Sequence, residues 1–136
     1  MVRPINRNIM LLSKVSEPAT HKDLYIADDL IDTLTANAKA CVGMAANMIG
    51  EYKRVIVFHN GLFPEVMFNP EIVGQSGKYE TMEGCLSLLG ERPCTRYENI
   101  TLKYQDRSFK WITRSFSGYT AEIIQHEIDH CNGVII

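Results

Sequence analysis

Residues 126–130 read His-Glu-Ile-Asp-His, and this stretch is the most informative one for the fold and the binding properties of the chain. On a helix, the H-E-x-x-H pattern places two imidazoles one turn apart on one face, with a carboxylate beside them. Two histidines supply half of a tetrahedral metal site, whereas a catalytic metal normally has three protein ligands and one open position. The pentapeptide therefore predicts a metal-binding helix that needs a third ligand from another segment.

The third ligand is expected upstream, because only residues 131–136 follow the second histidine. Peptidases with this motif take that ligand from downstream sequence, so a peptidase of this kind is disfavoured. Cys131 points roughly 100° away from His130 around a helix of 3.6 residues per turn. Residue chemistry alone leaves five upstream candidates open: Cys41, Glu83, Cys85, Cys94 and Asp106.

The simplest alternative is a pair of surface histidines beside a solvated glutamate. Against it, the two histidines continue an apolar stripe that includes Tyr119 and Ile123 at helical spacing. Two imidazoles one turn apart are costly to bury unless they share a partner. The stripe therefore favours a metal site.

Apolar spacing predicts a helix over about residues 21–40, which begins with the capping box Thr20-His-Lys-Asp23. Strands are predicted at 54–59, 66–68, 71–73, 100–105 and 110–113, with turns at 60–61, 74, 77 and 106–108. A second helix is predicted over 117–131. The order helix, strands, helix predicts an α+β fold in which antiparallel sheets pack around the C-terminal metal-binding helix, with an N-terminal helix.

Length and composition predict one domain over residues 1–136, since 136 residues suffice for a single core. A net charge of −2 gives no electrostatic support for a nucleic-acid or membrane surface. The apolar runs are too short to span a bilayer. Four cysteines without a CxxC pair, and no apparent signal peptide, predict reduced thiols in the cytoplasm.

Three segments, in this order, together resemble peptide deformylase. Residues 41–48, Cys-Val-Gly-Met-Ala-Ala-Asn-Met, are similar to that family's G-x-G-φ-A-A-x-Q segment, where φ is apolar. Residues 83–87 match E-G-C-L-S in full, and residues 125–130 match Q-H-E-x-D-H in full. The similarity extends from Arg3 to Gly133.

The resemblance implies a metal site made of Cys85, His126 and His130. Fe²⁺ is the expected native ion, and Zn²⁺, Ni²⁺ and Co²⁺ are accepted in the family. It further implies hydrolysis of the N-formyl group of formyl-methionyl nascent peptides near the ribosome, with release of formate. Glu127 would act as general base and then as general acid. The backbone N–H of Leu86 and the glutamine of the first segment would hold the oxyanion.

The resemblance also implies less specific roles. Substrate contacts are expected from Gly43, Met44, Arg92, Tyr119 and Ile123. Residues expected to orient the ligands are Glu83, Arg96, Gln125 and Asp129. For Glu83, Arg96 and Asp129, an ordinary structural ion pair is the alternative.

The chain departs from the family at Met48, which stands where the family has the oxyanion glutamine, and at Cys41, which replaces a glycine. A thioether donates no hydrogen bond. In other acyl-transfer enzymes, the loss of one oxyanion donor costs about 10²–10³ in kcat. Asn47 could substitute only if a local strand were shifted. We therefore expect a deformylase of reduced activity; the alternative is a paralogue that binds metal and an N-terminal peptide without useful turnover.

Overall fold

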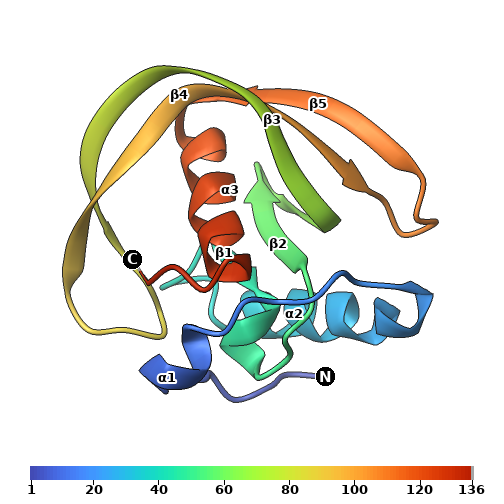
Figure 1. Cartoon of the computed structure of the whole chain (residues 1–136). Coiled ribbons are helices and arrows are strands. Elements are labelled where there is room, and N and C mark those ends of the chain that lie inside the picture. Colours follow the sequence, from blue (N-terminus) through green and yellow to red (C-terminus); the bar gives the residue numbers. More distant parts are fainter. Residues whose placement is uncertain (136) are drawn as a thin grey trace.

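Five strands form one antiparallel sheet in the order β1-β2-β3-β4-β5, and the long β3–β4 pair arches over helix α3 (Figure 1). The structure, a computed structural model, describes residues 1–135. Its elements are α1 (Ile9–Leu12), the 3₁₀ helix η1 (His21–Asp23), α2 (Leu24–Ala36), β1 (Gly43–Ala45), the 3₁₀ helix η2 (Ala46–Ile49), β2 (Val55–Asn60), β3 (Phe63–Gly84), β4 (Glu91–Gln105), β5 (Trp111–Ser117) and α3 (Gly118–Cys131). The expected α+β fold with a C-terminal helix against antiparallel strands is confirmed.

The prediction of separate strands at 66–68 and 71–73 is wrong, because both belong to the continuous strand β3. The pairing of β3 with β4 shifts register between Phe68 and Glu71 and again between Ile72 and Gly74. Irregularities of this kind bend a strand without ending it. Gly74 and Gly77 therefore lie within the strand, where they had been expected to mark turns.

Other boundaries also differ from the expectation, including that of β5, which runs on to Ser117. The capping box at Thr20 is present, but it begins a 3₁₀ turn, and α2 ends at Ala36. Strand β4 begins at Glu91, well before the predicted residue 100, because residues 91–99 are mostly polar and conceal the strand pattern. These differences leave residues 37–42 and 85–90 as connecting segments at the ends of β1 and β3.

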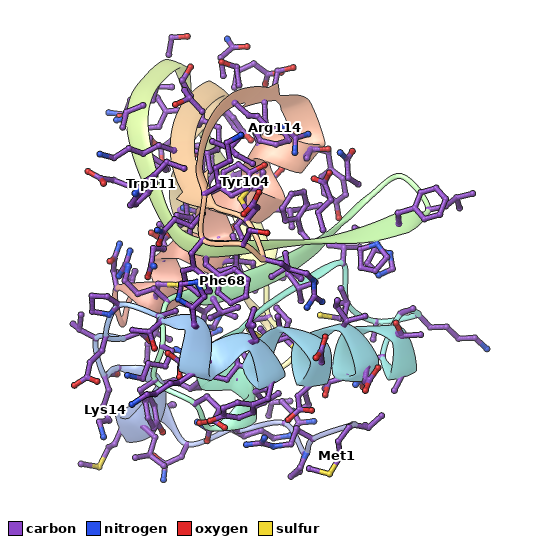
Figure 2. All side chains as sticks on the ribbon, turned by 90° about the vertical axis from the view of Figure 1, so that its right-hand side faces the viewer. Met1, Lys14, Phe68, Tyr104, Trp111 and Arg114 are labelled. Atoms are coloured by element: carbon purple, nitrogen blue, oxygen red, sulfur yellow. The ribbon has the colours of Figure 1, made fainter. Side chains whose placement is uncertain are left out.

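Strand β2 lies between the two main helices, and this position explains why its residues are apolar without interruption. Val55 and Val57 pack in one core cluster with α2, whereas Ile56 and Phe58 pack in a second cluster with α3. Successive side chains of a strand face opposite sides, so a strand covered on both sides is apolar throughout. Figure 2 shows Phe68 next to α2, with Tyr104 and Arg114 farther from that helix.

Within residues 1–135, no helix combines the length and the apolar character needed to cross a membrane.

Candidate metal centre and active site

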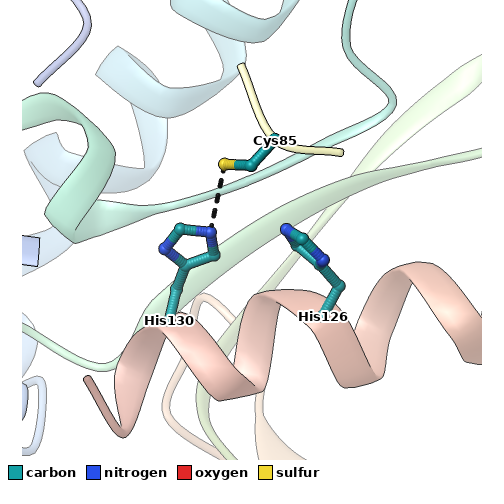
Figure 3. Close-up of side chains that lie close together, drawn as sticks. All are labelled: Cys85, His126 and His130. Carbon is teal, nitrogen blue, oxygen red and sulfur yellow. Dashed lines mark hydrogen bonds between the residues drawn. The ribbon is translucent and has the colours of Figure 1, made fainter. Parts of the chain in front are cut away.

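The structure brings Cys85, His126 and His130 together, and their ligand atoms all lie within 4.8 Å of one another (Figure 3). The two imidazoles project from successive turns of α3, and their ring centroids are 5.1 Å apart. Cys85 directly follows the end of β3, and its Sγ lies 3.3 Å from Nε2 of His130. One thiolate and two imidazoles suit a late transition-metal ion such as iron or zinc. The residues present therefore fit a metal ion.

Among the other upstream candidates, Glu83 contacts one of the two histidines. Its Oε1 lies 2.8 Å from Nδ1 of His126, which leaves Nε2 of that ring free to face Cys85. Hydrogen bonding of the second ring nitrogen to a carboxylate is how metal-binding histidines are usually oriented. Cys41, Cys94 and Asp106 are not part of the three-residue cluster.

The two histidines have opposite electrostatic environments. Burial lowers the pKa of His126, but hydrogen bonds to Cys85 and Glu83 outweigh it and raise that pKa to about 10. Burial and the neighbouring charge of His126 lower the pKa of His130 to about 3. In the metal-free protein, His126 thus holds a proton that a metal ion must displace, since metal ligands bind in their deprotonated forms.

Arg96, on β4, joins Glu83 at the end of β3 to Asp129 on α3. Its guanidinium donates to both carboxylate oxygens of Glu83, at 2.9 and 2.7 Å, and to Oδ2 of Asp129 at 2.7 Å. Burial opposes the charge of Glu83, but hydrogen bonds from His126 and Arg96 hold the pKa of this carboxyl well below its usual range. Glu83 therefore pairs with Arg96 and also contacts His126, whereas within residues 1–135 the side chain of Asp129 is hydrogen-bonded to Arg96 alone.

Gln125 has a different role from the one expected of it. Its amide accepts from the N–H of Tyr97 at 2.9 Å and donates to the carbonyl of Tyr97 at 2.8 Å and to that of Ala121 at 2.9 Å. Being one residue before His126, it points about 100° away from that ring around the helix. The side chain of Gln125 therefore joins α3 to the backbone of β4, and within residues 1–135 none of its hydrogen bonds goes to Cys85, His126 or His130.

Glu127 is 4% exposed, and its Oε1 has no hydrogen-bond partner among the described residues. Burial raises the pKa of this carboxyl to about 7. Strand β1 passes close to it: a Cβ added to Gly43 would lie 2.9 Å from Oε2 of Glu127 and 2.7 Å from Cγ2 of Ile123. Only glycine therefore allows β1 to pack this tightly against α3.

A cavity of about 420 Å³ opens beside these residues. It is lined by residues 38–43, Met48, 82–86, Glu91, Tyr119, Glu122, Ile123, His126 and Glu127. Of the residues expected to contact substrate, Gly43, Tyr119 and Ile123 line it. Met44 does not, because it is fully buried in the core cluster with α2. Arg92 does not line it either, and its neighbour Glu91 does.

Met48 and Leu86, the two positions tied to the oxyanion, line the same cavity. Within residues 1–135, the N–H of Leu86 has no hydrogen-bond acceptor. Asn47 cannot replace the missing donor, since its amide donates to the carbonyls of His130 at 3.0 Å and Leu12 at 3.3 Å. Residues 46–49 form a 3₁₀ helix where strand geometry had been assumed.

Sequence reasoning missed Met82, Glu91 and Glu122 as cavity residues. The helical period carried a signal for Glu122, which stands one turn before His126 on the same face. Met82 and Glu91 belong to the facing ends of β3 and β4, in a pairing that local sequence does not reveal.

Comparison with known proteins finds members of one family, and they match the chain along almost its whole length. The family model for polypeptide deformylase matches residues 5–136. Peptide deformylase of Clostridium beijerinckii is 51% identical over 136 residues, which is 100% of both proteins. Peptide deformylase of Dictyoglomus thermophilum is 39% identical over 127 residues, covering 91% of this chain and 80% of that protein.

Solved structures agree with the sequence comparisons. Class I type b peptide deformylase from Acinetobacter baumannii, crystallised with Met-Ala-Ser, has a TM-score of 0.89 at 29% identity and covers 99% of this chain and 97% of its own. A peptide deformylase from Legionella pneumophila has a TM-score of 0.89 at 35% identity, covering 99% of this chain and 83% of its own. With its three motif segments gathered around one cavity and these relatives along its full length, the chain belongs to the peptide deformylase family.

Proposed function

We propose that this chain hydrolyses the N-formyl group of formyl-methionyl peptides and releases formate, with Cys85, His126 and His130 as the metal ligands. The observation that supports these roles best is the position of Glu127. A buried carboxylate with a free oxygen lines the same cavity as the ligand cluster. The close relative from Clostridium beijerinckii carries the name peptide deformylase, and the Acinetobacter baumannii structure holds Met-Ala-Ser.

Glu127 takes the proton of the attacking water and later gives it to the departing amine. A general base and acid works best when its pKa lies near the working pH, and burial raises the pKa of Glu127 to about 7. A divalent ion bound by the three ligands would supply Lewis acidity, lowering the pKa of water and polarising the formyl carbonyl. One carboxylate can serve both steps because proton uptake and proton release follow one another.

The N–H of Leu86 donates to the oxygen that becomes negatively charged during the attack. A backbone donor already placed in the cavity wall needs no rearrangement as that charge develops. Met48 occupies the same wall and donates nothing, so we expect a slower chemical step than in relatives with glutamine. Since Glu127 and the ligand cluster are intact, turnover is weakened and not abolished.

We propose Fe²⁺ as the native ion, with Zn²⁺, Ni²⁺ and Co²⁺ as substitutes, since one thiolate and two imidazoles suit all four ions. A ferrous ion bound by a thiolate is sensitive to oxidation, so purification under anaerobic conditions is needed. The substrates are formylated nascent chains, so we expect the enzyme to act in the cytoplasm and near the ribosome.

Product analysis tests the reaction itself. Iron-loaded protein, purified anaerobically, is incubated with formyl-Met-Ala-Ser, and the peptides are identified by mass spectrometry. We expect intact Met-Ala-Ser and formate, with no cleavage of internal peptide bonds. Chelator-treated protein is the control and should leave the peptide formylated. Cleavage at an internal bond would mean a peptidase, and no metal-dependent change would contradict the proposal.

A further inference from the structure

Two consecutive residues before α1 hydrogen-bond to both positions that are tied to the oxyanion. The N–H of Asn6 donates to the carbonyl of Met48 at 2.7 Å. Nη1 of Arg7 donates to the carbonyl of Leu86, also at 2.7 Å. Met48 belongs to η2 and Leu86 to the connecting segment 85–90, and both residues line the cavity. Asn6 and Arg7 do not line it, so they join these two segments from outside the cavity.

The direction of the Leu86 N–H depends on the two peptide groups that flank this residue. The first contains that N–H and the carbonyl of Cys85, which accepts from the N–H of Leu88 at 3.0 Å. The second contains the carbonyl of Leu86, and no backbone N–H of residues 1–135 donates to it. The guanidinium of Arg7 takes that place. Each peptide group is therefore held by a hydrogen bond, and Arg7 supplies the second of the two.

The backbone at Arg7 is itself held on both sides. Before it, Asn6 is bonded to η2 a second time, because its Nδ2 donates to the carbonyl of Asn47 at 3.1 Å. After it, Asn8 caps α1 and accepts from the N–H of Met10 at 3.0 Å. A side chain on a fixed backbone has less conformational freedom to lose when it forms a contact. The guanidinium of Arg7, although exposed, thus extends from an ordered segment.

We propose that Arg7 is a positioning residue for the reaction, and that its hydrogen bond to segment 85–90 keeps the N–H of Leu86 directed at the developing oxyanion; this inference rests on the proposed function. An oxyanion donor must lie about 2.7–3.1 Å from the oxygen that becomes charged, so a small rotation of the peptide group weakens it. This charge exists in the transition state and not in the bound substrate. Loss of the Arg7 contact should therefore lower kcat and leave KM nearly unchanged.

The test measures kcat and KM for formyl-Met-Ala-Ser with iron-loaded wild type, Arg7→Met and Arg7→Lys at equal metal content. Arg7→Met keeps most of the aliphatic stem and removes the donor. Its kcat should fall about ten-fold, which is less than the loss of about 10²–10³-fold that removal of an oxyanion donor causes. Its KM should stay within about two-fold of the wild-type value. Arg7→Lys retains a cationic donor and should regain most of the lost kcat.

Arg107→Met is the matched control, because Arg107 is another exposed arginine, it pairs with Asp28 at 3.0 Å, and it does not line the cavity beside the metal cluster. This variant should keep the kcat of the wild type. A fall in kcat as large as that of Arg7→Met would indicate a general effect of net charge and would overturn the proposal. A loss in Arg7→Met that Arg7→Lys does not relieve would overturn it too, because the donor would then not be the cause.

Two further results would overturn the proposal: an unchanged kcat in Arg7→Met, or a raised KM with unchanged kcat, which would mean a contact in substrate binding. Should the wild type release no formate, the proposed function fails. Hydrogen–deuterium exchange then tests the contact separately. The amides of residues 85–90 should exchange faster in Arg7→Met than in wild type and Arg107→Met, because the segment has lost one of its hydrogen bonds. Equal exchange in all three proteins would show that Arg7 does not hold this segment.

Discussion

Oε1 of Glu83 lies 2.8 Å from Nδ1 of His126 and also accepts from Nη2 of Arg96 at 2.7 Å. One buried carboxylate oxygen thus contacts a proposed metal ligand and a guanidinium that also donates to Asp129. The hydrogen bond between Nδ1 of His126 and Glu83 holds the ring so that Nε2 faces Cys85. The three proposed ligands are therefore already clustered by contacts within the protein.

Loss of the charge on Glu83 should weaken metal binding. Glu83→Gln keeps the shape of the side chain, but the neutral amide orients His126 less firmly, and we expect metal affinity to fall about 10- to 100-fold. Competition with a chelator of known affinity measures the effect. Asp129→Asn is the control, because Asp129 reaches the site only through Arg96, and its loss should weaken binding less. Equal affinity in Glu83→Gln and wild type would contradict the orienting role.

Replacement of the thiolate tests the ligand assignment directly. Cys85→Ser exchanges a soft thiolate for a hydroxyl that is protonated near neutral pH, so we expect the metal to bind weakly and to be lost on dialysis. Cys94→Ser is a matched control, since Cys94 is a buried thiol outside the cluster. Metal analysis after dialysis should show full metal occupancy in Cys94→Ser and little bound metal in Cys85→Ser. Stoichiometric, equally tight metal in Cys85→Ser would refute the assignment.

A restored donor at Met48 should accelerate the chemical step. Met48→Gln places an amide in the cavity wall, and one additional oxyanion donor should raise kcat by about one to three decades. Met48→Leu is the control, because leucine fills similar space without a donor and should leave kcat near the wild-type value. Steady-state formate release measures both variants. If kcat is the same in Met48→Gln and wild type, another group has taken over this role.

The buried carboxyl of Glu127 should make the stability of the metal-free protein depend on pH. Its folded-state pKa, raised by burial to about 7, lies above the ordinary value of 4.5, so the folded state binds this proton more tightly than the unfolded chain does. The resulting loss of folding stability is absent below about pH 4.5. It grows as the pH rises and is complete above about pH 7. Glu127→Gln removes it.

Between pH 5 and pH 8, the free energy of unfolding of Glu127→Gln relative to wild type should therefore increase by about 1–3 kcal/mol. Urea denaturation of the two metal-free proteins at several pH values measures this difference. A difference that is constant across this pH range would show that Glu127 titrates no differently in the folded protein.

Short local patterns in the sequence pointed to most of the residues that the structure brings together at the cavity. The 126–130 pentapeptide and the 83–87 segment each have fixed local spacing, so they pointed to the three residues that the structure clusters and to the carboxylate that contacts His126. The direction of a side chain in an unassigned segment was harder to predict. Met44 was expected in the substrate pocket, but in β1 it faces α2, and Asn47 turns toward α3 because its segment is a 3₁₀ helix.

The strand boundaries were missed for a different reason. Gly74 and Gly77 are typical turn residues, and only the pairing of β3 with β4 shows that the strand runs through them. The same pairing sets Glu91 opposite Gly84 and so brings it to the cavity. Contacts between residues on facing strand ends depend on register, which a mostly polar segment such as the start of β4 specifies only weakly.

We propose that Glu127, beside a metal held by Cys85, His126 and His130, acts as the general base in removal of the formyl group. The most direct test of this role is the rate of formate release from formyl-Met-Ala-Ser by iron-loaded wild type and Glu127→Ala at equal metal content. We expect steady release by the wild type and a rate at least about 10²-fold lower in the variant, the usual contribution of a general base. Formate release by the wild type that does not exceed that of Glu127→Ala would show that Glu127 is not the general base.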